Sequence, residues 1–106
     1  MAKFNFKPQH IVSRLEEGEH TGILKEIYYL EEKGSFWFKI NVDGVILNTS
    51  LSQNSIVFNN FAINFVDDNG CFDTDDLINK MIKFNVKDSK LNNTIFSKIT
   101  EIKIAE

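Results

Sequence analysis

Residues 18–48 constrain the fold of this chain most, because apolar and polar residues alternate there with the two-residue period of a β-strand. The stretch GEHTGILKEIYYLEEKGSFWFKINVDGVILN predicts two strands that are joined by a short charged turn and run into a third. The alternation is clearest in its middle part, where Phe36, Phe38, Ile40 and Val42 alternate with Ser35, Trp37, Lys39 and Asn41. Successive side chains of a strand point to opposite faces, so the first set is expected in a core and Trp37 on the other face.

Other features of residues 18–48 predict where these strands bend and turn. The first strand, from residue 19 onward, is apolar on both parities, which predicts burial on both sides or a bend that Gly22 would suit. The charged sequence EEKG then marks a turn. Asp43-Gly44 between two apolar runs predicts a two-residue hairpin, because such a turn needs positive φ at both central positions. The third strand contains Val45, Leu47, Thr49 and Leu51.

The chain then crosses through an irregular segment. Residues 54–65 fit both a strand and a short helix, and aromatic residues at helical spacing favour the helix, with Asn54 or Ser55 as its cap. The sequence DDNG at 67–70 marks a tight turn, and Thr74 is expected to cap a further short turn.

Residues 82–87 and 94–104 predict two more strands, joined by a polar loop at 88–93. The isoleucines of the last strand change parity, which predicts a bulge near residues 98–100. The chain is therefore expected to be mainly β, with five strands and a short helix between the third and the fourth. Closure removes exposed edges and uses strands that bend between sheets, so these features predict a partly closed five-stranded barrel of the OB-fold type over residues 18–106.

Residues 1–17 are expected to form an N-terminal arm outside this barrel. Phe4 and Phe6 alternate with polar residues ahead of Pro8, which fits a short extended piece, and IVSRLEE at 11–17 fits a single helical turn. Neither piece has a clear cap. The arm is therefore expected to be partly mobile or to dock on a neighbour, which makes it a candidate for contacts in a homo-oligomer.

Charge is unevenly distributed along the chain. Twelve Lys and Arg against fifteen Asp and Glu give a net charge of −3, which argues against holding duplex DNA by charge alone. Residues 16–32 hold six glutamates and one lysine, and residues 67–76 hold five aspartates and no basic residue. Residues 80–103 hold six lysines against Asp88 and Glu101, which fits either a basic strip on one face or a solvated strand face.

Several classes of protein are disfavoured. No apolar run approaches the roughly twenty residues that span a bilayer, and the N-terminus lacks a secretion signal, so a cytoplasmic protein without membrane contact is expected. The single cysteine, Cys71, allows no intramolecular disulfide and is expected to be a part-buried thiol beside a turn. His10 and His20 lack metal-ligand and catalytic spacing, and residues 67–76 lack the spacing of an EF-hand, so no enzyme, metal or cofactor is expected.

Four segments give the chain a resemblance to a known family. They are LEEGEHTGILKEI, the Phe-Trp-Phe strand, INKMIKFNVKDSK and FSKITEI, within residues 15–104. In these segments the chain resembles small OB-fold single-stranded-DNA-binding proteins of bacteriophages and conjugative elements in low-GC Gram-positive bacteria. The resemblance implies a non-enzymatic protein of DNA replication or transfer, encoded on a phage, plasmid or other mobile element. The chain departs from it in its lower positive charge and in its end at IKIAE, without the acidic, aromatic-ended tail that recruits partners in bacterial replication proteins of this class.

Single-strand binding requires aromatic faces for base stacking and cations for phosphates, and stacking contributes roughly 1–3 kcal/mol per base. Trp37 is the best stacking candidate because of its outward parity, and Tyr29 is a second candidate for which a core position is also open. The candidates for phosphate contact are Lys25, Lys39, Lys83, Lys87 and Lys90. The loops at 31–34 and 88–93 are expected to frame the groove. Packing of Trp37 under the arm or in a dimer interface is the alternative.

A second hypothesis belongs to another class of protein. The acidic segments 16–32 and 67–76 would bind a basic protein partner, as in an accessory or host-inhibitory factor, with Trp37 as an anchor. The position of Trp37 distinguishes the two hypotheses. If Trp37 is exposed in a groove beside Lys39 and Lys83, single-strand binding is favoured. If the N-terminal arm covers Trp37, that hypothesis loses its main support.

Overall fold

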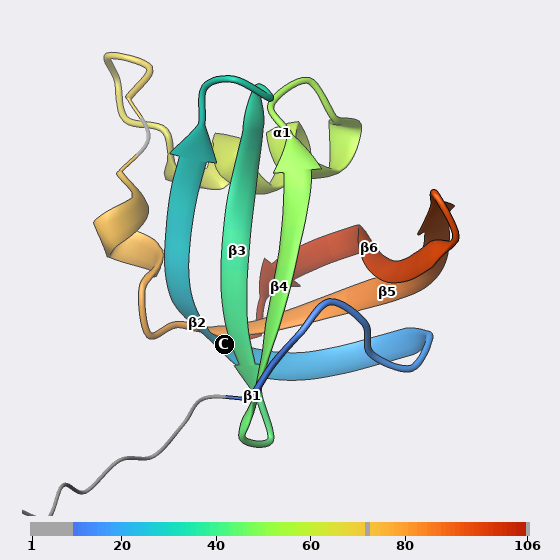
Figure 1. Ribbon diagram of the computed structural model, residues 1–106. Helices are drawn as coiled ribbons and strands as arrows, with labels where there is room; N and C mark the ends of the chain where they lie inside the picture. Colours follow the sequence, from blue (N-terminus) through green and yellow to red (C-terminus); the bar gives the residue numbers. More distant parts are fainter. Residues whose placement is uncertain (1–9, 72, 106) are drawn as a thin grey trace, which may run out of the picture.

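The part of the chain that the structure describes folds as a six-stranded sheet that carries one short α-helix (Figure 1). The computed structural model describes residues 10–71 and 73–105, so the predicted arm segment 1–9 lies outside the described residues. The strands are β1 (His10–Val12), β2 (Gly18–Leu30), β3 (Ser35–Val42), β4 (Val45–Ser52), β5 (Met81–Leu91) and β6 (Thr94–Ile104). Their order is β1-β4-β3-β2-β5-β6, in which β1 and β4 are parallel and the other pairs are antiparallel. The mainly β class is confirmed, but the described strands form an open order of six rather than a closed ring of five.

β2 joins the two parts of the sheet because its halves pair with different strands. Residues 23–30 pair with β3, and residues 18–23 pair with β5. The register against β3 shifts at Lys25, which is an extra residue on β2. Such a bulge bends a strand and increases its twist. The halves of β2 accordingly run in different directions in Figure 1, as expected of a strand that bends between two parts of the sheet.

Two hairpins turn through pairs of residues with positive φ. Asp43 and Gly44 have φ of 51° and 87°, which confirms the predicted hairpin between β3 and β4. Asn92 and Asn93 have φ of 50° and 68° and join β5 to β6. Asparagine tolerates this conformation better than most other residues with a side chain. The polar loop predicted at 88–93 is therefore wrong, because strand pairing continues up to the two asparagines.

The bulge predicted near residues 98–100 is confirmed. Thr100 is an extra residue of β6 in its pairing with β5. An extra residue shifts the parity of the side chains that follow it. Ile99 and Ile102 are consequently both buried, although they lie on opposite parities of the sequence.

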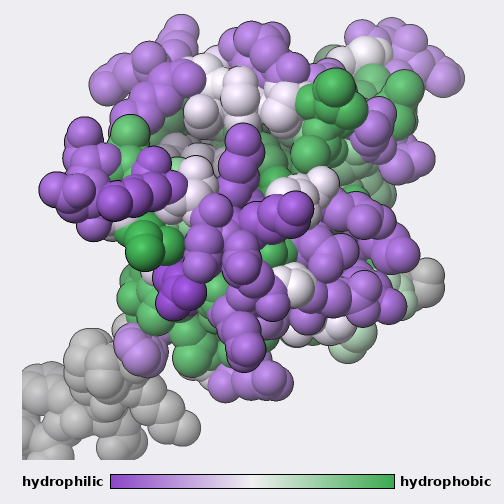
Figure 2. All heavy atoms as spheres, turned by 90° about the vertical axis from the view of Figure 1, so that its right-hand side faces the viewer, coloured by the Kyte–Doolittle hydropathy of each residue, from purple (hydrophilic) through white to green (hydrophobic). Residues whose placement is uncertain are grey.

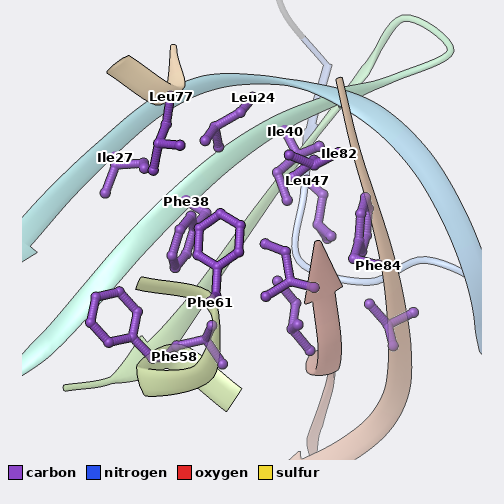
Figure 3. Close-up of a cluster of buried hydrophobic side chains, with 14 of the residues drawn as sticks. Leu24, Ile27, Phe38, Ile40, Leu47, Phe58, Phe61, Leu77, Ile82 and Phe84 are labelled. Carbon is purple, nitrogen blue, oxygen red and sulfur yellow. The ribbon is translucent and has the colours of Figure 1, made fainter. Parts of the chain in front are cut away.

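The helix predicted within residues 54–65 is also confirmed, as α1 (Ile56–Ala62). Ser55 is its cap, since the Phe58 N–H donates to the Ser55 hydroxyl oxygen at 3.0 Å. Phe58 and Phe61 are buried and project from α1 toward Phe38 of β3 (Figure 3). The helix therefore covers the core side of the sheet and leaves the other side of β3 free for a site.

Two short 3₁₀ turns follow α1, one before the acidic segment 67–76 and one that overlaps its end. They are η1 (Ile63–Phe65) and η2 (Thr74–Leu77). The cap of η2 is Asp73 and not the predicted Thr74, because the Asp73 carboxylate accepts the N–H of Asp75 at 2.9 Å. Cys71 is exposed, so the prediction of a part-buried thiol is wrong.

Residues 10–12 add a strand that the sequence did not predict. β1 pairs with β4 from His10 opposite Val45 to Val12 opposite Leu47. The helical turn expected at 11–17 is therefore wrong, because its first residues are extended beside β4. Three residues are too few to show an alternation, and their partner strand is distant in the sequence, so no local signal marks β1.

Residues 13–17, which we call the strap, connect β1 to β2 and contact β6 through Ser97. The Ser97 N–H donates to the Ser13 carbonyl oxygen at 2.8 Å. The buried Ser97 hydroxyl accepts the Leu15 N–H at 2.8 Å and lies 3.2 Å from the Leu15 carbonyl oxygen, to which it donates. From the other side, the Thr49 hydroxyl of β4 donates to the Ser97 carbonyl oxygen at 3.0 Å. Ser97 thus connects β4, β6 and the strap.

Ser97→Ala is expected to lower the free energy of unfolding by about 1–3 kcal/mol, because it leaves two part-buried backbone groups of Leu15 without their partner. Urea unfolding followed by Trp37 fluorescence measures this loss. Ser89→Ala on the facing strand is the matched control and is expected to change stability by less than about 0.5 kcal/mol. Equal losses in the two variants would show that the hydroxyl at Ser97 has no special role.

Candidate nucleic-acid interface

Trp37 lies on the side of β3 that faces away from the core. Its neighbours Phe36 and Phe38 pack in or against the core, as the alternation predicts. On the adjacent strands, Tyr28 of β2 and Ser50 of β4 are its partners in the register. Its side chain is partly buried rather than free on the surface.

A groove of about 320 Å³ lies beside Trp37, and we call it the Trp37 groove. It is lined by Ser13, Lys33, Ser35, Trp37, Asn48, Thr49, Ser50, Leu91 and Phe96. These residues come from the β2–β3 turn, from β3 and β4, from the β5–β6 hairpin and from the strap. Both segments that were expected to frame a groove, 31–34 and 88–93, contribute to it. The described part of the arm contributes only Ser13.

The lining combines the three kinds of group that bind an unpaired nucleotide. Trp37 supplies an aromatic ring, and the ammonium nitrogen of Lys33 lies 5.9 Å from the centre of that ring. Leu91, which is 64% exposed, and Phe96 supply an apolar wall on the hairpin. A base can stack on such a ring while a nearby cation meets its phosphate.

Two polar atoms of the lining have no hydrogen-bond partner among the described residues. They are the indole nitrogen Nε1 of Trp37 and the amide oxygen Oδ1 of Asn48, and both are shut off from solvent. An unpaired buried polar atom costs roughly 1–3 kcal/mol. Both atoms belong to residues of the lining, and neither is open to solvent.

The predicted lysines do not gather around Trp37. Lys39, two residues along β3, forms an ion pair with Glu26 at 3.5 Å and lies 5.9 Å from the ring centre of Tyr28. Lys83 forms an ion pair with Glu19 at 3.2 Å, where β5 pairs with β2. Acidic residues on neighbouring strands thus neutralise two of the expected phosphate contacts.

The other predicted lysines are dispersed. Lys25 sits at the β2 bulge, and its ammonium donates to the Asn79 side chain at 3.4 Å. Lys87 lines a second hollow, of about 370 Å³, whose wall also contains the carboxylates of Glu17 and Glu101. Lys90 is exposed near the tip of the β5–β6 hairpin. Lys90 is next to Leu91 in β5 and therefore points to the other face of the hairpin, away from the groove wall.

Tyr29 lies on the opposite side of the sheet from Trp37. Its ring packs against Phe36 at 4.9 Å between centres, and its hydroxyl donates to the Gln53 side chain at 3.3 Å. The extra residue Lys25 shifts the parity of β2, so Tyr28 and not Tyr29 is beside Trp37. The structure therefore does not bring Tyr29 to the groove.

An exposed ion pair holds the strap near the base of the hairpin. The Arg14 guanidinium donates to both carboxylate oxygens of Asp88, at 3.0 and 2.8 Å. These hydrogen bonds, more than charge attraction, lower the pKa of Asp88 and raise the pKa of Arg14. Because the pKa of Asp88 is lowered in the folded state, the pair stabilises the fold above the ordinary pKa of aspartate. That contribution is lost as the pH falls through the lowered value.

Of the lining residues, sequence reasoning named only Trp37 as a binding residue. Those that it missed include Lys33, Asn48, Leu91 and Phe96. Lys33 and Leu91 belong to segments that were expected to frame the groove, so their positions could have been predicted. Asn48 shares the outward side of β4 with Ser50, a parity that the apolar alternation of that strand indicates. Phe96 gave no usable signal, because the bulge in β6 obscures its parity.

The side of the molecule that carries the β5–β6 hairpin has no continuous apolar surface. In Figure 2 its hydrophobic side chains form separate patches divided by hydrophilic ones. Within residues 10–71 and 73–105, no helix is long and apolar enough to span a membrane. The same residues contain no group of three or more His, Cys, Asp and Glu side chains that could hold a metal ion.

No protein-family model matches this chain, and no curated protein matches it either. A function is therefore inferred from the chemistry of the Trp37 groove.

Proposed function

We propose that the protein binds single-stranded DNA in the Trp37 groove, largely without sequence preference, and so supports replication or transfer of a mobile element. The observation that carries the proposal is the Trp37 ring in a groove with Lys33 beside it and an apolar wall opposite. Every unpaired base offers a face for stacking, whereas in a duplex the base faces are already stacked on one another. Such a groove therefore favours an unpaired strand.

We also propose that the sheet is an OB-fold barrel formed by β2 to β6, to which β1 is an addition. Its support is the order β4-β3-β2-β5-β6, in which one bent strand pairs on both sides. The hydrogen bond from Thr49 to Ser97 brings the two ends of this order together. In such a barrel the turns at the two ends of the sheet frame a ligand groove.

The charge distribution sets the expected salt dependence. Lys33 is the lysine that lines the groove, since Lys39 and Lys83 have carboxylate partners and Lys90 points to the other face of the hairpin from Leu91. Each phosphate contact to a single strand contributes about −0.7 to the slope of log K against log salt, so one contact by Lys33 gives a slope of about −0.7. Stacking, which is independent of salt, is expected to carry most of the affinity.

The test is the binding of a fluorescent oligonucleotide at low and moderate salt. Trp37→Ala is expected to weaken binding about fivefold or more, because stacking contributes about 1–3 kcal/mol per base. Tyr29→Ala is the matched control: it removes an exposed aromatic ring from the other side of the sheet and is expected to leave the affinity unchanged. The proposal fails if micromolar protein does not bind, or if Trp37→Ala binds as well as the unchanged protein.

A second candidate function is recognition of a basic protein by the acidic segment 67–76. It is favoured by the exposure of all five aspartates of this segment and by the ion pairs that neutralise Lys39 and Lys83. Asp67 and Asp73 accept backbone hydrogen bonds, so charge reversal belongs at Asp68, Asp75 and Asp76. On this hypothesis, reversal abolishes capture of a basic partner and leaves oligonucleotide binding unchanged.

A further inference from the structure

We propose that Tyr28 and Lys39 form a second nucleotide position beside the Trp37 groove, in which Glu26 keeps Lys39 from a phosphate. This position rests on the proposed single-strand binding, since it takes the next base of the same strand. On the outward side of β2 and β3, Tyr28 and Lys39 repeat the arrangement of Trp37 and Lys33.

Tyr28 lies directly across from Trp37 in the pairing of β2 with β3. Residues opposite one another on paired strands point to the same face, with their Cβ atoms about 5 Å apart. Both residues are partly buried, so part of each side chain stays open to solvent. A strand with one base on Trp37 therefore meets Tyr28 as the neighbouring aromatic surface.

Each of the two rings has a lysine at the same distance. The ammonium nitrogen of Lys33 lies 5.9 Å from the centre of the Trp37 ring, and that of Lys39 lies 5.9 Å from the centre of the Tyr28 ring. Single strands are bound where aromatic rings stack on bases and nearby cations meet phosphates. The unit of one ring and one cation thus occurs twice, on adjacent strands, which fits two nucleotides of one chain.

The second unit differs from the first in its carboxylate. Glu26 lies directly across from Lys39 and forms an ion pair with it at 3.5 Å. Its negative charge repels a phosphate that approaches Lys39. In the unchanged protein the second position therefore binds by stacking on Tyr28, and the phosphate contact of Lys39 is unused.

The ion pair can be changed without harm to the fold. The side chains of Lys39 and Glu26 are 30% and 52% exposed. Ion pairs so open to water contribute little to stability. Glu26→Gln, which keeps the shape of the side chain, is therefore expected to fold normally and to free Lys39 for a phosphate.

The experiment measures the affinity of Glu26→Gln for fluorescent oligo(dT) at 50 and 200 mM salt. The unchanged protein, with one phosphate contact by Lys33, is expected to lose about threefold in affinity over this range. The variant, with Lys39 as a second contact, is expected to lose about sevenfold and to bind about twofold or more tightly at the lower salt. Adding Lys39→Gln to this variant is expected to restore the salt dependence of the unchanged protein.

Glu19→Gln is the matched control. It makes the same change in net charge and frees Lys83 from its own ion pair. Lys83 pairs with Thr21, which is seven residues from Tyr28 along β2. Glu19→Gln is therefore expected to keep the salt dependence of the unchanged protein.

Two variants of Tyr28 test the stacking. Tyr28→Leu removes the ring but keeps an apolar side chain, and it is expected to weaken oligo(dT) binding about fivefold or more. Tyr28→Phe keeps the ring and is expected to bind within about twofold of the unchanged protein. If both variants lose affinity equally, the ring is not the contact and the second position is wrong.

The outcomes separate this position from the function on which it rests. Normal binding by Tyr28→Leu, or equal salt dependence of Glu26→Gln and Glu19→Gln, overturns the second position and leaves binding at Trp37 in place. Absence of binding by the unchanged protein overturns both.

Discussion

Gly22→Ala is expected to lower the free energy of unfolding by about 3 kcal/mol, at the upper end of the cost of overpacking a core. A Cβ at this position would lie 2.6 Å from the carbonyl oxygen of Asn41 and 2.8 Å from Cγ2 of Ile40. The oxygen belongs to the backbone of β3 and cannot move without disturbing the β3 ladder. Urea unfolding followed by Trp37 fluorescence measures the loss.

Thr21→Ala is the control for this prediction, because Thr21 is the exposed neighbour of Gly22 on β2. It is expected to change stability by less than about 0.5 kcal/mol. Gly44→Ala offers a second comparison: its φ of 87° is unfavourable for alanine, but a Cβ there meets nothing within 4 Å. If Gly44→Ala costs more than Gly22→Ala, close packing of β2 on β3 is not what requires glycine at residue 22.

The parts of the fold that the sequence predicted are those with local causes. The turn at Asp43-Gly44 needs positive φ, the cap at Ser55 needs a side-chain oxygen, and the bulge at Thr100 leaves a change of parity in the sequence. β1 has no such cause. It is three residues long, and its extended shape depends on pairing with β4, which no pattern within residues 10–12 encodes.

The site was predicted less well because it depends on the register between strands. Trp37 was placed correctly on the outward side of β3, since alternation within one strand decides that. Tyr29, for which a core position was also open, lies on the Phe36 side of the sheet and not beside Trp37, because one extra residue, Lys25, reverses the parity of the rest of β2. A lysine is available for a phosphate only if no carboxylate on a neighbouring strand pairs with it. The ion pairs of Lys39 with Glu26 and of Lys83 with Glu19 could be assigned only once the pairing of the strands was known.

The same register separates the residues of β3 that stabilise the fold from those that line the groove. Each residue of β3 from Phe36 to Ile40 serves either the core or the outer side, because β3 is paired on both edges and keeps one orientation along its length. Stability and binding should therefore be separable by mutating adjacent residues. Phe38 and Trp37 are the pair that tests this most directly.

Phe38→Ala is expected to lower the free energy of unfolding by about 3–5 kcal/mol, because its fully buried ring fills the space under α1 and its removal leaves a cavity. The ring lies 6.5 Å from that of Phe58, centre to centre, and helix and sheet meet there (Figure 3). Unfolding followed by far-ultraviolet circular dichroism measures the loss in both Phe38 and Trp37 variants. Trp37→Ala is expected to cost less stability, since its side chain is only partly buried.

Because Phe38→Ala removes a large part of the 5–15 kcal/mol that stabilises an ordinary domain, Phe38→Leu is the variant in which binding is measured. It is expected to lose less than about 1.5 kcal/mol and to bind oligonucleotides within about twofold of the unchanged protein. Trp37→Ala should show the reverse, with weak binding and a smaller loss of stability than Phe38→Ala. If Phe38→Leu weakens binding as much as Trp37→Ala, the groove depends on the packing of the whole strand, and the loss of binding in Trp37→Ala no longer identifies its ring as the contact.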